Sequence, residues 1–364
     1  VAIVILISIV LLFYFLNQSN NQDSQKVVIG ISPFPDTYMP YLGKIKGWYK
    51  EEGLDVEFRV LGWTEVQEAL SSGASDRIDI GINNISSIIA TYDRNPELVY
   101  YYGNNTFDNG FALMIRPEGE MKPLNFFIKQ GMELSDAIAA TGAQLKGKTV
   151  VTTANTDMEQ GVAAVAKKGG ISFTKDVSIV NLNPDDGLTA FLSGTGDAFI
   201  GGIPQRNKAG EQGMIEMITG TNLGPPPING LVTTKKFVEG NEEALLKITK
   251  VWFKIVNYTN DNLDEVAKTM TEELNRKTGS KVSVDDFKKF WNNYEHYPSS
   301  PQEIQKEILS AEGRNYWKER WDDCNDYFYN IKGTIPRPVP FEEAFYMIDA
   351  QKKLVEFLEK DDAK

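Results

Sequence analysis

Residues 26–61 read KVVIGISPFPDTYMPYLGKIKGWYKEEGLDVEFRVL, and this stretch contains one complete strand–helix–strand unit. Residues 27–31 form a short apolar run that ends at a turn rich in proline, which is typical of a buried parallel strand. The helical pattern that follows ends at Gly53, the residue type that most often closes a helix. Residues 54–61 then alternate between apolar and polar side chains as a second strand. Such a unit predicts a parallel sheet covered by helices.

The alternation of strands and helices continues and then restarts. Further strands are predicted at 78–82 and 98–102, and a second series runs from 110 to 218 with a polar, partly helical insertion at 117–144. Repeated units of this kind favour mostly parallel sheets with helices on both faces. A strand at 231–234 returns to the first series, and the remainder of the chain is nearly all helical.

We therefore expect an α/β protein with two doubly wound lobes, joined by hinge crossings at 114–116 and 232–234. The predicted segments are an N-terminal anchor and tether at 1–25, the first part of lobe 1 at 26–112, lobe 2 at 113–230, and the rest of lobe 1 with a helical C-terminal tail at 231–364.

Composition excludes several classes of function. The chain has 364 residues, which suits two lobes, and 38 basic against 50 acidic side chains give a net charge of −12. A surface with this charge repels phosphate backbones, so we expect no nucleic-acid partner. The one cysteine, Cys324, and the one histidine, His296, exclude an internal disulfide and multi-histidine or cysteine-rich metal sites. We expect no cofactor and no metal.

The N-terminal segment is the most informative feature of the composition. Residues 1–16 are apolar except for Ser8, and residues 17–25 are polar and resemble a loop. Sixteen helical residues span roughly 24 Å, slightly less than a hydrocarbon core of about 30 Å. A cleaved signal peptide would need small residues near its end, and a lipoprotein would need a cysteine there. The pattern favours an uncleaved transmembrane anchor, which places the protein on the periplasmic or extracellular face of the cytoplasmic membrane.

Four short motifs occur in an order and spacing that resemble one protein family. They are GWYKEEGLDVE at 47–57, ALSSG at 69–73 followed by IDIG at 78–81, LKGKTV at 145–150, and AFLSG with GDA at 190–198. Together they resemble the periplasmic solute-binding proteins of ABC importers for nitrate, sulfonate, taurine and thiamine precursors (NMT1/THI5-like). The resemblance covers roughly 26–259. It fades at the 117–144 insertion and in the aromatic-rich tail.

The resemblance implies the type II periplasmic-binding-protein fold, with a small-molecule solute captured by closure of the lobes and an ABC permease as membrane partner. In such a fold the ligand lies between the lobes, at the carboxyl ends of the strands. In lobe 1 these positions offer aromatic, amide and carboxylate groups, although turns, packing and helix caps use the same residue types. The lobe 1 candidates are Phe34, Asp36, Tyr38, Trp63, Thr64, Asn83, Asn84 and Ser86.

Lobe 2 contributes two further loops. The candidates are Asn155, Thr156, Asp157, Gln205 and Arg206. Thr156 and Glu159 also have the spacing of a capping box, which alone could explain both. The acidic side chains near 157–159 oppose an anion at this helix N-terminus, although its N–H groups would otherwise attract one. The set of groups therefore favours a neutral or amine-bearing heterocycle over an inorganic anion.

Three classes of function compete. Solute binding for an importer fits the motifs best. The alternative is an anchored scaffold or accessory subunit of a membrane assembly with a degenerate cleft, because a fold does not fix its function. In that case the tail aromatics should be exposed, whereas in an importer protein they should be buried. An enzyme is disfavoured, since Cys324 and His296 both fall in the tail.

Overall fold

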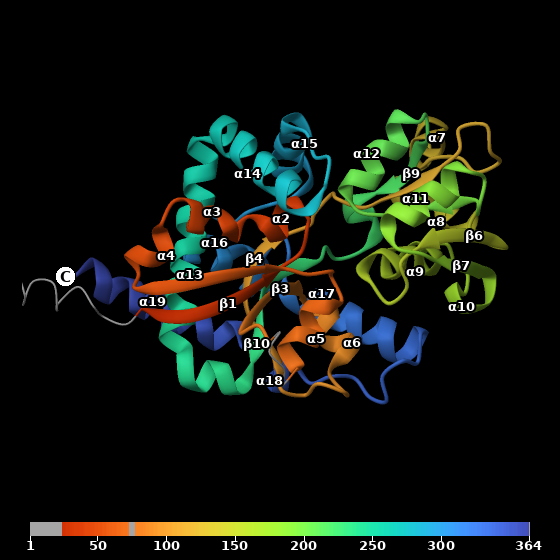
Figure 1. The fold of residues 1–364 in the computed structure, drawn as a ribbon. Helices are drawn as coiled ribbons and strands as arrows, with labels where there is room; N and C mark the ends of the chain where they lie inside the picture. Colours follow the sequence, from red (N-terminus) through yellow and green to blue (C-terminus); the bar gives the residue numbers. More distant parts are fainter. Residues whose placement is uncertain (1–23, 73–76, 364) are drawn as a thin grey trace, which may run out of the picture.

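The computed structural model describes residues 24–72 and 77–363, which form two α/β lobes and a helical tail (Figure 1). Each lobe is built on a five-stranded sheet, with the orders β2-β1-β3-β10-β4 and β7-β6-β8-β5-β9. The strands of the first sheet are β1 (Gln25–Ile31), β2 (Leu54–Val60), β3 (Ile80–Asn84), β4 (Leu98–Thr106) and β10 (Ile228–Thr234). Those of the second are β5 (Ala112–Ile115), β6 (Lys148–Thr152), β7 (Val177–Asn181), β8 (Ala198–Phe199) and β9 (Ile215–Thr219).

The two sheets share one design. In the first, β1 is parallel to β2 and β3, with Val27 opposite Val56, while β10 runs antiparallel between β3 and β4. In the second, β6 is parallel to β7 and β8, while β5 runs antiparallel between β8 and β9. Val27, Ile29 and Ile31 point to one face of the first sheet and are fully buried by the helices packed on that face.

The lobes are joined by two crossings, 107–111 and 220–227, which are held together where the Phe107 N–H donates to the Pro227 carbonyl over 2.9 Å. The crossings predicted at 114–116 and 232–234 are misplaced. Met114 and Ile115 belong to β5, which pairs with β8 and β9. Residues 232–234 belong to β10, which pairs with β3 and β4. The physical reason is that the chain leaves the first sheet as soon as β4 ends at Thr106 and returns to it when β10 begins at Ile228, so both crossings come earlier in the chain than predicted.

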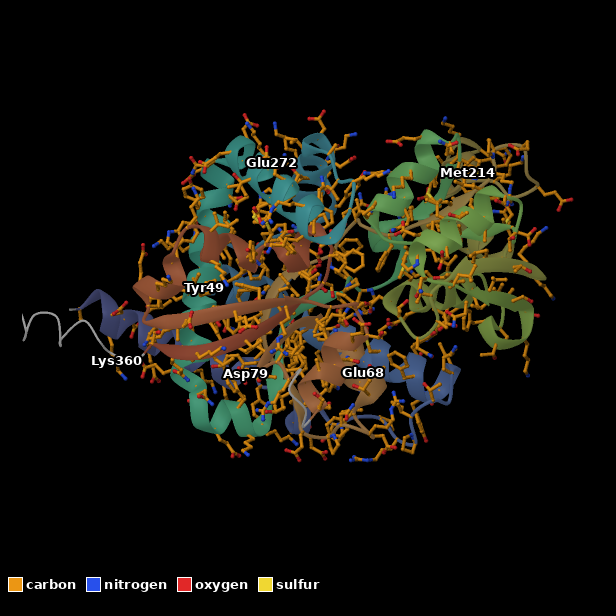
Figure 2. All side chains as sticks on the ribbon, in the orientation of Figure 1. Tyr49, Glu68, Asp79, Met214, Glu272 and Lys360 are labelled. Atoms are coloured by element: carbon orange, nitrogen blue, oxygen red, sulfur yellow. The ribbon has the colours of Figure 1, made fainter. Side chains whose placement is uncertain are left out.

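Short helices cover the sheets. In lobe 1 they are α2 (Pro35–Tyr38), α3 (Pro40–Ile45), α4 (Trp48–Glu51), α5 (Glu65–Ser71) and α6 (Ile85–Thr91). In lobe 2 they are α7 (Leu124–Lys129), α8 (Leu134–Ala143), α9 (Asp157–Lys168), α10 (Phe173–Asp176), α11 (Pro184–Leu192) and α12 (Ile203–Glu211), with η1 (Gly220–Leu223) at the second crossing. Figure 2 shows side chains filling both lobes, with Tyr49 in lobe 1 and Met214 in lobe 2.

The insertion at 117–144 forms α7 and α8 and belongs to the core of lobe 2. Helix α8 packs closely on α9, with Ala137 and Thr141 fully buried. At Gly142 an added Cβ atom would lie 2.3 Å from the Val165 carbonyl oxygen, so only glycine permits this approach. The insertion also exposes apolar side chains at its outer end, among them Phe126 and Leu134.

The tail is helical, as predicted, and packs mainly on lobe 1. Its elements are α13 (Lys235–Asp261), α14 (Leu263–Thr278), α15 (Val284–Lys289), η2 (Phe290–Tyr294), α16 (Pro301–Ile304), η3 (Gln305–Leu309), α17 (Trp317–Asn325), η4 (Asp326–Ile331), α18 (Phe341–Ala344) and α19 (Met347–Asp362). Trp291, Trp317, Trp321 and Tyr327 are buried, which confirms core packing for these aromatics, whereas Tyr329 is 40% exposed.

Across 24–72 and 77–363, no helix combines the length and the apolar character that a membrane span requires. The anchor predicted at residues 1–16 lies outside the described residues.

Candidate functional site

Polar side chains of lobe 1 gather at the ends of its strands. Asp36 lies in α2, directly after β1, and is 8% exposed. The Asn229 side chain, at the start of β10, donates a hydrogen bond to Asp36 over 2.8 Å. Glu295, just after η2 in the tail, is also buried and accepts a hydrogen bond from Asn105 of β4. The antiparallel β10 therefore brings its first residue to the edge where β1 and β4 end.

Asp36 and Glu295 make this edge electrostatically unusual. Burial raises the pKa of Asp36 from 3.8 to about 6. Burial also raises the pKa of Glu295 well above its ordinary value, and the neighbouring charge of Asp36 adds to that shift. Two carboxyl groups in one desolvated place disfavour each other's charged form, so a cationic or hydrogen-bond-donating group would be stabilised there.

The aromatic candidates divide into a surface pair and a core residue. The rings of Phe34 and Trp63 meet edge to face, with centroids 6.3 Å apart, and both are partly exposed. Tyr38 is 1% exposed and packs against Tyr41, with centroids 5.3 Å apart, so the structure places it in the core. Thr64 is exposed at the start of α5, and its side chain makes no capping hydrogen bond.

Asn83 and Asn84 fix the entrance to α6. The Asn84 side-chain oxygen caps the helix by accepting from the Ser87 N–H over 3.1 Å, and it also accepts from the Ser86 hydroxyl over 2.9 Å. The Asn83 side-chain nitrogen donates to the Trp63 carbonyl over 3.2 Å, which holds the loop after β2. Asn84 is therefore the residue that caps α6.

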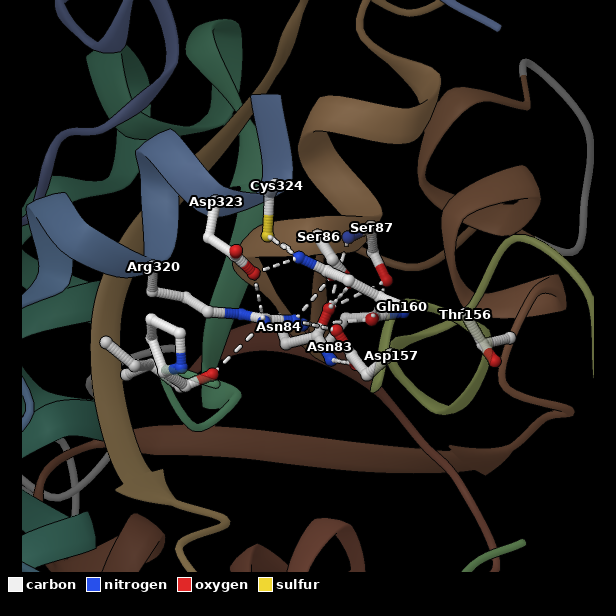
Figure 3. Close-up of polar contacts among 12 residues, drawn as sticks. Asn83, Asn84, Ser86, Ser87, Thr156, Asp157, Gln160, Arg320, Asp323 and Cys324 are labelled. Atoms are coloured by element: carbon white, nitrogen blue, oxygen red, sulfur yellow. Dashed lines mark hydrogen bonds and ion pairs between the residues drawn. The ribbon is translucent and has the colours of Figure 1, made fainter. Parts of the chain in front are cut away.

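Asn84 also reaches across to lobe 2. Its side-chain nitrogen donates to one carboxylate oxygen of Asp157, the first residue of α9. The other carboxylate oxygen accepts from the guanidinium of Arg320, which comes from α17 in the tail (Figure 3). Side chains from lobe 1, lobe 2 and the tail thus converge on one buried carboxylate.

The capping box predicted at Thr156 and Glu159 does not form. The Thr156 hydroxyl donates to the Thr153 carbonyl over 2.7 Å instead of accepting from the helix. Glu159 accepts from the N–H of Asn155, a residue in the left-handed region at φ 60°. The Glu159 carboxylate is also taken by the tail, since it accepts from Tyr327 over 2.7 Å and from Lys332 over 2.8 Å.

The two candidates in α12 are committed to other protein groups. Arg206 is buried, pairs with Glu216 over 2.6 Å and donates to the Gly110 carbonyl over 3.1 Å, so it holds the first crossing. Its guanidinium also lies 4.8 Å from the ring centre of Tyr294 in η2. The Gln205 side chain donates to Asp185 over 2.9 Å, within lobe 2.

The tail residues of the site, Glu295, Arg320 and Asp323, were missed from sequence. Arg320 carries one signal that could have revealed it. It lies three residues after Trp317 and directly before Trp321, on the apolar face of a helix that buries both tryptophans. A charged residue on such a face needs a buried partner. The sequence does not indicate which residue that partner is.

A small pocket remains beside these contacts. It is lined by Asp157 and Gln160 of α9, by Arg320 and Asp323 of the tail, and by the prolines of the second crossing, residues 225–227. Its space for water is about 20 Å³, roughly the room for one water molecule. The two lobes and the tail are therefore in contact at this point, while a larger opening of about 110 Å³ lies between Pro35 of lobe 1, α12 of lobe 2 and Phe290 of the tail.

Comparison with known proteins gives the family. The NMT1-like family matches residues 20–271. The protein YtlA of Bacillus subtilis (strain 168) is 25% identical over 273 residues, which are 73% of this chain and 75% of YtlA.

Solved structures of periplasmic binding proteins share the fold. The aliphatic sulphonate-binding protein SsuA of Escherichia coli is 16% identical with a TM-score of 0.66, covering 88% of this chain and 91% of that chain. The nitrate-binding protein NrtA of Synechocystis PCC 6803 is also 16% identical with a TM-score of 0.64, covering 93% of this chain and 90% of that chain. The two-lobed fold and the family resemblance predicted from the motifs are both confirmed. Because the family match extends over more than half of the sequence, the chain belongs to the NMT1-like family.

Proposed function

We propose that this protein is an extracytoplasmic solute-binding protein that captures a small organic solute between its lobes and delivers it to an ABC-type permease. The observation that carries the proposal is the convergence of polar side chains from both lobes at their strand ends. Asn84 follows β3 of lobe 1, and Asp157 follows β6 of lobe 2. Ligands of open α/β sheets bind at such edges. Family membership supports the same conclusion.

The chemistry of the lobe 1 edge supports a neutral or amine-bearing solute. Asp36 and Glu295 are buried, and among the described residues the largest effects on the pKa of either carboxyl come from burial, backbone N–H groups, amide and hydroxyl side chains and the other carboxyl. An amine or amidine N–H could donate to either carboxyl group, whereas nitrate or a sulfonate would be repelled by the charge of Asp36 at neutral pH. Phe34 and Trp63 would supply an aromatic wall for a heterocycle.

We also propose that residues 1–16 anchor the protein to the cytoplasmic membrane, with 17–25 as a tether. The support is the sequence alone, an apolar run interrupted only by Ser8. The first strand begins at Gln25, so the tether would lead directly into lobe 1.

The second candidate is an anchored scaffold with a degenerate cleft. One observation favours it. Arg320 of the same chain binds the Asp157 carboxylate, and the pocket beside this pair has a volume of only about 20 Å³. Against it, most tail aromatics are buried in the protein itself, as expected for an importer protein.

A thermal-shift screen of the full chain in nanodiscs tests the proposal, with intrinsic fluorescence of its 6 tryptophans as readout. The solutes are amines, aminopyrimidines and amino acids, with nitrate, taurine and alkanesulfonates as the competing class. A solute at 100 times its Kd adds about 2.7 kcal/mol to the free energy of unfolding, a shift of a few degrees. We expect a hit among the amine-bearing compounds that is lost in Asp36→Asn and kept in Asp55→Asn, an exposed control in β2. A screen without hits would favour the scaffold.

A further inference from the structure

The tail contacts α9 of lobe 2 along its length, although its main packing is on lobe 1. We propose that residues 317–332, which we call the clasp, hold the two lobes closed in the absence of solute, so that solute entry requires release of the clasp. The clasp consists of α17, η4 and Lys332. The inference rests on the proposed function only for the identity of the solute that enters the cleft, because the contacts that hold the lobes closed are formed within the chain itself.

The base of the clasp is fixed to lobe 1 by aromatic stacking. The Trp317 ring stacks on Phe345 with centroids 4.0 Å apart, and Phe345 stacks on Tyr100 of β4 with centroids 5.6 Å apart. Trp321 is 1% exposed and its indole N–H donates to the Val339 carbonyl over 3.0 Å. Helix α17 also packs against α6. This side of the clasp is apolar and dry, so it moves with lobe 1.

The other side of the clasp is polar and faces α9. Besides its pair with Asp157, the Arg320 guanidinium donates to the Gln160 side-chain oxygen over 2.9 Å. The Gln160 nitrogen donates in return to Asp323 over 2.6 Å (Figure 3). These reciprocal contacts fix the first turn of α9 against the clasp.

Three further contacts extend the attachment along α9. Glu159 is held by Tyr327 and Lys332 over 2.7 and 2.8 Å, and Lys167 pairs with Asp326 over 2.9 Å. From Asp157 to Lys167 the helix rises about 15 Å, so the clasp follows nearly its whole length. In Figure 1 the α17 segment of the tail reaches from lobe 1 toward α9.

Opening the lobes must separate the clasp either from lobe 1 or from α9. Separation from lobe 1 would expose Trp317 and Trp321 to water, which is costly for large apolar surfaces. Separation from α9 would break the pair of Arg320 and Asp157, whose side chains are 5% and 8% exposed. Breaking a buried pair leaves charges uncompensated until water reaches them. Because water can rehydrate polar groups, the face toward α9 is the one that releases.

A zero-length crosslink on the unmodified chain tests the clasp without any mutation. A carbodiimide joins the Lys167 amine to the Asp326 carboxylate as an amide with loss of water, provided that the two groups touch. The control is Lys254 with Glu51, an exposed pair within lobe 1 and its tail at 2.6 Å. The full chain in nanodiscs is dialysed until mass spectrometry finds no bound small molecule. We expect both crosslinks in comparable yield. If the control forms and the Lys167–Asp326 crosslink stays below a tenth of it, the clasp does not close the solute-free protein.

Substitution of the central arginine gives the second test. We expect Arg320→Gln to lower the Lys167–Asp326 crosslink several-fold and to enlarge the radius of gyration by X-ray scattering. Lys318→Gln removes the same charge from the same helix, but Lys318 pairs with Asp322 one turn away and lies 5.8 Å from the centre of the Phe341 ring in the tail, so it should behave as wild type. Should Arg320→Gln lose its circular dichroism signal, Tyr327→Phe with Lys332→Gln removes the contacts to Glu159 instead. A folded variant with the wild-type crosslink and radius would overturn the proposal.

These outcomes are independent of the solute screen. A negative screen with a positive crosslink would remove the proposed solute and keep the clasp, whereas a positive screen with a negative crosslink would do the reverse.

Discussion

The guanidinium of Arg320 donates to the carboxylate of Asp157, although 163 positions separate the two residues in the chain. Asp157 begins the helix of lobe 2 that faces the cleft, and Arg320 belongs to the part of the tail that follows the family match at 20–271. A segment beyond the family match therefore binds Asp157, the carboxylate of lobe 2 that also contacts Asn84 of lobe 1.

Arg320→Met should be strongly destabilising. It leaves the Asp157 charge buried without its partner, which costs about 3–5 kcal/mol in comparable pairs. Urea unfolding followed by circular dichroism measures the change. Lys318→Met, at a half-buried position of α17 whose ion pair with Asp322 is partly exposed, should change the free energy of unfolding by less than about 0.5 kcal/mol. Adding Asp157→Asn to Arg320→Met should recover part of the loss, and equal losses in the single and double variants would contradict this account.

The contribution of Asp36 to the stability of the protein should fall as the pH rises from about 4 to 6. The pKa of Asp36 is about 6 in the folded protein and 3.8 ordinarily, so in this window the folded state binds more protons than the unfolded chain. The free energy of unfolding should drop by up to about 3 kcal/mol from this group. Glu295, which faces it, adds a change of the same sign, because its pKa is also raised.

Asp36→Asn isolates that contribution. Denaturant titrations at several pH values should show a shallower decline for the variant than for the wild-type protein. Asp55→Asn, in an exposed position, should retain the wild-type slope. An unchanged slope in Asp36→Asn would mean that this carboxyl group does not titrate as its burial requires.

Gly142→Ala should loosen the insertion from lobe 2. The added Cβ atom would meet the Val165 carbonyl oxygen at 2.3 Å and the Gly169 nitrogen at 2.9 Å, and neither backbone atom can move freely. Such overpacking costs about 1–3 kcal/mol. Gly210→Ala is the matched control, because a Cβ atom there meets nothing within 4 Å inside a helix. That change should be neutral or stabilising by up to about 1 kcal/mol. Thermal unfolding of the two variants decides between these outcomes.

The thiol of Cys324 should be nearly inert in the folded protein. It is fully buried, and burial raises its pKa to about 12, so little thiolate is present at neutral pH. As the chain has 1 cysteine, the absorbance of a thiol reagent such as DTNB reports this site alone. The reaction should be at least 100-fold slower than in urea. Arg320→Gln should accelerate it if the clasp releases, and rapid labelling of the wild-type protein would contradict the burial.

Local sequence patterns were enough to predict the two lobes. The apolar run from Val27 to Ile31 predicts β1, because a strand buried on both faces is apolar throughout. The alternation after Gly53 predicts β2, because a strand buried on one face alternates between apolar and polar residues. The short motifs indicated the family for the same reason, since each lies within one strand–helix unit. Asp36, Asn84 and Asp157 could be predicted as candidate binding residues because ligands of such folds bind at the carboxyl ends of the strands.

The partners of those residues could not be predicted. The spacing of Thr156 and Glu159 predicted a capping box that does not form, and Glu159 instead binds Tyr327 and Lys332, which no local pattern reveals. Arg206 has the appearance of a surface side chain, yet the fold buries it under Tyr294 and at the first crossing. Contacts between residues more than a hundred positions apart depend on how the lobes and tail pack, and single-chain periodicity carries no information about that.

The position of β10 has a consequence for the order in which the chain can fold as it is synthesised. β10 lies between β3 and β4 and supplies the hydrogen bonds that both require, so the first sheet stays incomplete until Thr234 has emerged. The second sheet uses only strands between Ala112 and Thr219, a continuous segment that is finished earlier. The lobe that begins first is therefore completed last. Until then β3 and β4 have unpaired edges, the feature that makes a nascent chain prone to wrong pairing.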